Sequence, residues 1–182
     1  MGSEMCIRDS IAGAVALSHL TIVNARINTR KDGTILDAFR LQDEERQAVR
    51  DQATLSRLKD RMQKALMGEM NLHVALAKKW ESAPARLRAL SVPPRVIVTN
   101  KRSKSYTVIE VNGRDRPGLL YQLTYHIAQL GLQIHSASVS TYGEKAVDVF
   151  YVKDIFGLQI RSELTVEKVK QKLMAILESG KA

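Results

Sequence analysis

The segment at residues 112–120 combines residue types that suit a turn which binds an anion through its backbone. It reads Asn-Gly-Arg-Asp-Arg-Pro-Gly-Leu-Leu, after a β-branched run and before apolar residues at helical spacing. Asp115 suits a helix cap, and Pro117 suits the first helical turn. The amides of residues 118–120 are then expected to lack intrahelical acceptors at the positive end of a helix dipole, and Gly118 allows a close approach to them. Taken alone, the turn favours a simple capped helix start over a ligand site.

The other reactive residue types form no catalytic or metal-binding pattern. None of the four histidines, His19, His73, His126 and His135, has a second histidine at metal-ligand spacing. The single cysteine excludes a disulfide framework and a cysteine-rich metal cluster. No glycine-serine loop precedes paired carboxylates that hold magnesium and a nucleotide. The sequence therefore predicts no catalytic residue, no metal site and no cofactor in this chain.

The composition argues against further classes of function. Lysine and arginine number 28 against 19 acidic residues, which gives a net charge of +9. The basic residues are scattered along expected helices, and aromatic residues make up only 5%, so a nucleic-acid surface with stacking rings is disfavoured. No apolar run approaches the roughly 18 residues of a membrane span. We expect a protein of the reducing cytoplasm that binds neither nucleic acid nor membrane.

Much of the chain occurs twice. Residues 20–29 align with residues 132–141, and residues 37–43 align with residues 148–154, with the apolar positions in register. Helical patterns lie before and after both strand pairs. Each copy therefore reads helix, strand, hairpin, strand, helix, at a period too long for a solenoid. We interpret the chain as two small α+β units.

The repeat sets the expected domain boundaries. Residues 11–66 form a first unit that lacks its leading strand, and residues 67–94 form a helical linker. Residues 95–182 form the second unit, although the strand at 95–100 could instead complete the first sheet. Residues 1–10 match nothing in the second copy and are treated as a non-native leader. Strands are expected at 20–29, 35–42, 96–99, 106–112, 132–141 and 147–153.

The ordered motifs of the second unit resemble an ACT domain. They are the strand at 106–111, the loop at 112–120, the strand and turn at 136–144 and the strand at 148–154. The resemblance implies α+β, ferredoxin-like βαββαβ domains in tandem, with the first one truncated at its N-terminus. It also implies a module that binds amino acids and controls attached enzymes. The tandem is similar to the C-terminal region of the enzymes that attach uridylyl groups to the PII protein and remove them.

This resemblance implies a regulatory region that senses glutamine in the control of nitrogen metabolism. The parent enzymes carry a magnesium-dependent nucleotidyltransferase and a phosphohydrolase, and the sequence contains the motifs of neither. The implied partners are glutamine or another amino acid, the catalytic domains of the parent chain, PII through that parent, and the paired ACT unit. An ACT-repeat amino-acid-binding protein unrelated to uridylylation is the alternative.

The resemblance also implies where the ligand binds. Backbone amides at residues 118–120 receive the carboxylate of the amino acid, and Asp115 or a main-chain carbonyl receives its ammonium group. Residues 134–136, on a facing strand, close the site; for His135 alone, surface and binding roles are equally open. One ligand per chain is expected, because the first copy lacks the loop. The candidate ligand-binding residues are Asn112, Asp115, Arg116, Gly118, Leu119, Leu120, Ile134, His135 and Ser136.

Overall fold

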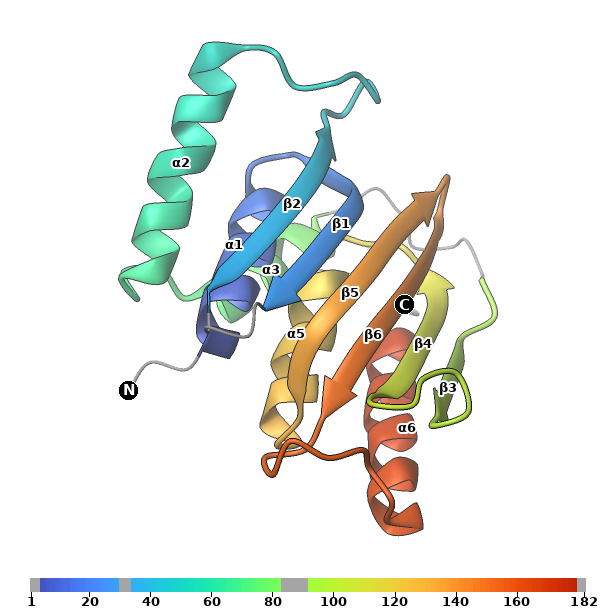
Figure 1. Cartoon of the computed structure of the whole chain (residues 1–182). Helices are drawn as coiled ribbons and strands as arrows, with labels where there is room; N and C mark the ends of the chain where they lie inside the picture. Colours follow the sequence, from blue (N-terminus) through green and yellow to red (C-terminus); the bar gives the residue numbers. More distant parts are fainter. Residues whose placement is uncertain (1–3, 30–33, 83–91, 180–182) are drawn as a thin grey trace.

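A single antiparallel sheet of six strands forms the centre of the protein. The computed structural model describes residues 4–29, 34–82 and 92–179. The strand order is β2-β1-β5-β6-β4-β3 (Figure 1). Every strand lies where the sequence predicts one, and the α+β class is confirmed. The strands are β1 Thr21–Thr29, β2 Ile35–Gln42, β3 Arg95–Thr99, β4 Thr107–Arg114, β5 Gln133–Tyr142 and β6 Lys145–Lys153.

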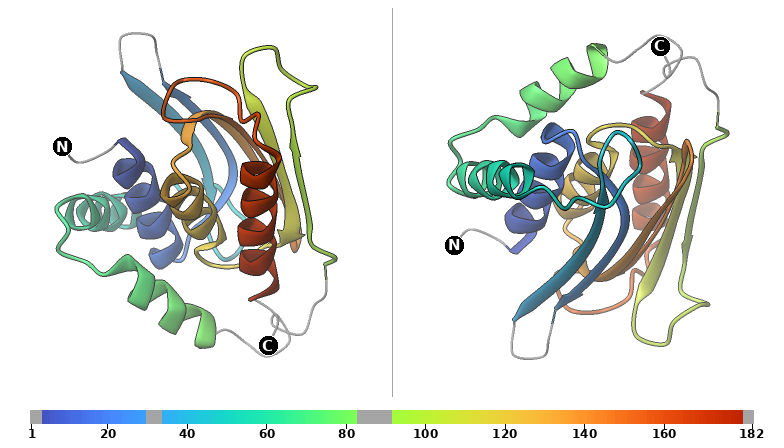
Figure 2. Two further views of the ribbon diagram at one scale, coloured as in Figure 1. Left: turned by 90° about the horizontal axis from the view of Figure 1, so that it is seen from below. Right: turned by 90° about the horizontal axis from the view of Figure 1, so that it is seen from above.

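Helices cover one face of this sheet in two layers (Figure 2). Helices α1 (Glu4–Leu17), α5 (Leu119–Gln129) and α6 (Glu163–Glu178) form the inner layer. Helices α2 (Gln52–Leu66) and α3 (Leu72–Glu81) pack on the outer side of α1. The main core lies between the sheet and α5 and α6; its largest fully buried side chains include Phe150, Ile109, Leu123, Ile127, Leu132 and Leu173.

Along strand β6 every second side chain is buried, so that one face of the strand points into the core. Ala146, Phe150 and Val152 point into the core and are at most 4% exposed. Asp148 falls on the same face and is 2% exposed. The repeating pattern of the strand therefore places a carboxylate inside an otherwise apolar layer.

The two sequence repeats join through an antiparallel pair of equivalent strands. In this pair β1 lies beside β5, with Ala25 opposite Val139. The Thr141 hydroxyl also donates to the Ile22 carbonyl at 3.3 Å. Both strands carry a register shift at the position that the sequence alignment makes equivalent, after Ile22 in β1 and after Ile134 in β5. The paired edges make one sheet out of the strands of both repeats.

Two details refine the expected organisation. The strand at 95–99 pairs with β4, so it forms the outer edge beside the second repeat. Helix α1 begins at Glu4 and so extends through part of the segment treated as a leader. The proposed domain boundaries and the non-native origin of that leader stay predictions.

Candidate functional site

A half-open cavity of about 590 Å³ lies where the two repeats meet. One wall comes from the end of α1 and the start of β1, and the opposite wall comes from residues 115–121 and α3. Strands β5 and β6 contribute Val139, Thr141 and Asp148. The cavity thus draws on both copies of the repeat. Its polar lining residues include His19, Asp43, Glu44, Arg46, Lys79, Asp115, Arg116, Thr141, Glu144 and Asp148.

The expected capping of α5 is wrong. Asp51 and Ser162 cap α2 and α6 through their side chains, whereas α5 begins at Leu119 without a side-chain cap. Asp115 is therefore no cap, and Pro117 precedes the helix instead of lying in its first turn. The reason is the left-handed conformation of the next residue, Gly118, which turns the chain directly into the helix.

This turn also changes which amides can meet a ligand. The Leu119 amide donates to the Arg116 carbonyl at 3.0 Å and is already occupied. The first i to i−4 bond of the helix runs from Gln122 to Gly118 at 3.0 Å. The amide of Leu120, in the first turn of the helix, therefore lies at the positive end of the helix dipole without an i to i−4 partner inside the helix. Leu120 lines the cavity.

Gly118 lies in the cavity lining, but the side of it where a Cβ would stand is covered. Its φ is +80°, and a Cβ added there meets Leu76 of α3 at 3.1 Å. The open side of the glycine is thus covered by a leucine from the helix that follows the first repeat. Glycine is required here by the backbone conformation and by this packing, and a carboxylate cannot approach from that side.

Burial raises the pKa of two of the acidic side chains that line the cavity, Asp148 and Asp115. Burial raises the pKa of Asp148 to about 8, helped by the charge of Asp115 and opposed by the Ser140 amide. Burial also raises the pKa of Asp115 to about 6. The backbone amide of Asp115 donates to the Glu144 carbonyl at 2.8 Å. The two carboxyl groups therefore titrate near neutral pH.

Asp148 also has unused hydrogen-bonding capacity. Its Oδ1 atom is buried and has no hydrogen-bond partner. A buried acceptor without a donor costs free energy, on the order of 1–3 kcal/mol. A ligand that brings a donor to this atom removes that cost. Sequence reasoning used Asp148 only to align the repeats; its charge at an inward position of a strand is the signal that would have found it.

The strand bulge that lines the cavity together with the loop at 115–121 belongs to the first repeat and not to the second. Residues 134–136 do not line the cavity, and the His135 ring instead lies 5.2 Å from the ring of Tyr106. Ile22 and Val23, their counterparts in the first repeat, line it. The expected strand residues Ile134, His135 and Ser136 therefore lie outside this cavity lining, and their contact with a ligand stays a prediction. The reason is the antiparallel pairing of β1 with β5, which brings the bulge of the first repeat to the loop of the second.

Two other predicted residues have structural contacts. Asn112 lies in β4 outside the cavity lining. Arg116 reaches the lining, but its guanidinium donates to the Ile176 carbonyl at 3.0 Å and to the Gln122 side chain. It also lies 5.9 Å from the ring centre of Trp80. Burial lowers the pKa of Arg116 to about 10, and its charge helps to hold α3 and α6 around the loop.

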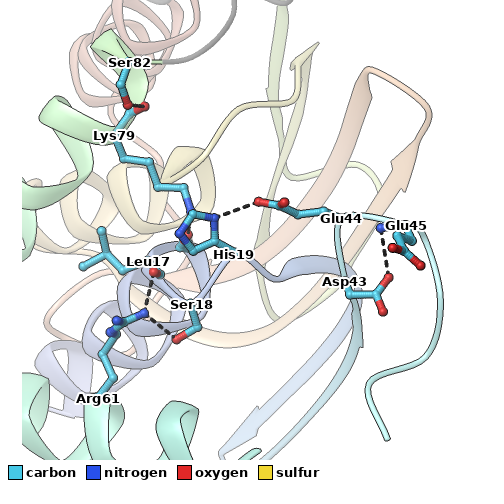
Figure 3. Close-up of polar contacts among 10 residues, drawn as sticks. Leu17, Ser18, His19, Asp43, Glu44, Glu45, Arg61, Lys79 and Ser82 are labelled. Carbon is cyan, nitrogen blue, oxygen red and sulfur yellow. Dashed lines mark hydrogen bonds and ion pairs between the residues drawn. The ribbon is translucent and has the colours of Figure 1, made fainter. Parts of the chain in front are cut away.

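Charged side chains that the sequence did not assign to the site also line the cavity. His19 Nδ1 lies 2.7 Å from Glu44 Oε1 (Figure 3). Lys79 Nζ donates to the Ala16 carbonyl at 2.8 Å, and burial lowers the pKa of this lysine. These residues come from the end of α1, the loop after β2 and α3. This part of the lining is thus formed by segments that meet only in the folded protein.

The arrangement suits a small ligand that carries both charges. The Leu120 amide and Lys79 offer donors to an anion, while Asp148 offers an acceptor to a cation. No three histidine, cysteine or acidic side chains are arranged to hold a metal ion in the described parts of the chain. Among the described helices, none has the length and apolarity to cross a bilayer.

The class of protein follows from this fold together with sequence comparison. Residues 102–179 match the model of the ACR family N-terminal ACT domain. This segment contains β4, α5, β5, β6 and α6, and it includes the loop and Asp148. Residues 102–179 therefore form an ACT domain.

Whole-chain comparison is more specific. The chain is 45% identical over 167 residues to the bifunctional uridylyltransferase/uridylyl-removing enzyme of Rhodospirillum rubrum, covering 92% of this chain. The enzymes of the same name from Gluconobacter oxydans and Azospirillum brasilense are each 44% identical, over 93% and 94% of this chain. The chain spans 18% of the length of each of these three relatives. It is similar to the ACT region of these enzymes along more than nine-tenths of its length.

Proposed function

We propose that this chain is the amino-acid-sensing region of a uridylyltransferase/uridylyl-removing enzyme, and that glutamine is the amino acid it senses. The observation that carries the proposal is the buried, unpartnered carboxylate oxygen of Asp148 in a cavity that also holds the start of α5. The ammonium group of a bound amino acid meets Asp148, and its carboxylate meets the start of α5. The family resemblance favours glutamine among the amino acids. It also favours a location in the cytoplasm.

In this proposal the ligand bridges both repeats. Its carboxylate accepts a hydrogen bond from the amide of Leu120, and its ammonium group donates to Asp148. Ile22 and Val23 of the first repeat close the other side. Because the walls belong to different repeats, the ligand stabilises the arrangement in which they are close. A ligand controls an attached enzyme only through such a difference in affinity between two states.

Isothermal titration of glutamine and the other common amino acids against the chain tests this function. We expect saturable binding of glutamine at one site per chain, and weaker binding of amino acids that differ in the side chain. The Asp60→Asn variant is the control, because the Asp60 side chain is exposed on α2 and pairs with Lys64. Absence of binding by every amino acid would contradict the proposal.

Binding is expected to strengthen as the pH rises from 6 to 8. The ammonium group needs the ionised form of Asp148, whose pKa in the free protein is about 8. Below that pH a proton must leave before the ligand binds, so the affinity is expected to fall about tenfold per unit of pH. Titrations at pH 6, 7 and 8 measure this slope. An affinity that does not change over this range would exclude proton release from Asp148 on binding.

The chain by itself is expected to neither attach nor remove uridylyl groups. Uridylyl transfer and its hydrolytic reversal depend on metal-bound groups, and the described residues contain no such cluster. Purified chain is incubated with PII, UTP and magnesium, and the mass of PII is followed. Modification of PII that persists after removal of contaminating host enzyme would disprove this expectation.

A further inference from the structure

Two loops at equivalent positions of the repeats have the same hydrogen bonds. Residues 43–47 follow β2, and residues 154–158 follow β6. In each loop the first aspartate accepts, through Oδ1, from the amides two and four residues later, at 2.8–3.0 Å. In each loop the aspartate amide also donates to the carbonyl four residues later. Arg46 and Gly157, at the fourth position, both have positive φ.

After the shared aspartate, the side chains on these matched backbones differ. The first loop carries Glu44, Glu45 and Gln47, and all three are exposed. The second loop carries Ile155, Phe156 and Leu158, which are 66%, 79% and 61% exposed. Because the first loop forms the same hydrogen bonds with polar side chains, the fold does not require apolar ones in the second. Apolar side chains held so far out on a fixed backbone are typical of a contact surface.

The surroundings of the second loop add a charge. Gln159 donates to the carbonyls of Ser103 and Tyr106, at 3.0 and 2.9 Å, so the turn at 101–106 lies beside the loop. That turn exposes Lys101 and Lys104, and Arg161, shortly after the loop in the sequence, is exposed as well. Leu164, at the start of α6, is a further apolar side chain and is 77% exposed. The exposed charged side chains near these apolar residues in sequence and space are thus mainly basic, with Glu163 as an exposed acid beside Leu164.

We propose that Ile155, Phe156, Leu158 and Leu164 form a docking surface for the part of the longer enzyme that lies outside the region matched by this chain. The surface fits an apolar pocket with an acidic border. Two copies of this surface would place mainly basic side chains against each other, which disfavours self-association. The matched relatives are more than five times longer than the region they share with this chain, so the partner is available in the same polypeptide.

Docking at this loop gives the sensing region a contact through which it acts. The loop continues from β6, the strand that carries Asp148, and only five residues separate that carboxylate from the end of the strand. Movement of β6 on ligand binding therefore displaces the docking loop directly. This role in control rests on the proposed function, whereas the existence of the contact does not.

Site-specific photocrosslinking tests the contact. The chain replaces the matching region of the full-length Rhodospirillum rubrum relative, with p-benzoylphenylalanine at position 156 or, as the matched control, at position 45. We expect position 156 to crosslink to peptides outside the exchanged region, at least several-fold more than position 45. Crosslinks confined to a second copy of the region, to added anionic lipid vesicles, or absent altogether would overturn the proposal.

A second experiment separates docking from ligand binding. The variant I155E/F156E/L158Q gives the second loop the side chains of the first. In the isolated chain we expect an unchanged melting temperature within about 2 °C and unchanged glutamine affinity, since only exposed side chains change. In the exchanged full-length enzyme we expect glutamine to lose its effect on the transferase rate. Retained control by glutamine would contradict the role of docking in control, whereas absence of glutamine binding by the unsubstituted chain would contradict the proposed function alone.

Discussion

Replacing Asp148 with asparagine is expected to make the protein more stable above pH 7 and to remove amino-acid binding. The pKa of Asp148 is about 8 in the folded protein, against an ordinary value of 3.8. The folded state therefore keeps a proton that the unfolded chain loses, and stability falls as the pH rises from about 4 to about 8. Asparagine is neutral throughout and avoids this loss. We expect a gain of about 1–3 kcal/mol in the free energy of unfolding at pH 8.

Denaturant unfolding at pH 5 and pH 8, together with glutamine titration, measures both effects. At pH 5 both the asparagine and the protonated acid are neutral, so the stability difference from wild type should shrink. The Asp60→Asn variant controls for the loss of a surface carboxylate. An Asp148→Asn protein that is less stable than wild type at pH 8, or that binds glutamine with unchanged affinity, would refute the role assigned to this residue.

Replacing Gly118 with alanine is expected to be the most destabilising of the glycine to alanine changes in the turns. The left-handed conformation costs an L-residue about 1–2 kcal/mol. The added Cβ also meets the Leu76 side chain of α3 at 3.1 Å, so that this side chain must shift by a few tenths of an ångström. We expect a total loss of about 2–3 kcal/mol in the free energy of unfolding. Because α3 lines the cavity, ligand affinity is expected to fall as well.

Gly68 offers a matched control for this substitution. Its φ is +74°, and an added Cβ there meets nothing within 4 Å. Gly68→Ala should therefore show the conformational cost alone. In a Leu76→Ala background, the cost of Gly118→Ala should drop to that of Gly68→Ala. Equal costs for both glycines in the otherwise unchanged protein would show that the contact with Leu76 contributes nothing.

The strands were predictable because each carries its own signal. The period of two in β6 and the β-branched residues of β4 depend on local sequence and on one buried face. The repeat supplied the same strands a second time and identified β1 and β2. The edge position of β3 was left open, because a short apolar strand fits either sheet until its partner is known.

The site was less predictable because it depends on how the two repeats associate. The sequence identified the loop at 115–120, which does line the cavity, but it assigned residues 134–136 as the facing strand. Because β1 pairs with β5 in antiparallel fashion, Ile22 and Val23 line the cavity in place of residues 134–136. Similarly, nothing local to Gly118 reveals that Leu76 lies over it. Contacts of this kind are set by tertiary packing and not by the turn itself.

Amide shifts in a ¹H–¹⁵N spectrum during glutamine titration test the central claim most directly. The claim is that the amino acid binds between the two repeats, with its carboxylate at the start of α5. We expect the largest changes at Leu120 and Tyr121, with further changes at Ile22 and Val23 across the cavity, and little change at the amide of His135. Saturable changes centred on residues 134–136, with Leu120 and Tyr121 unmoved, would contradict this site.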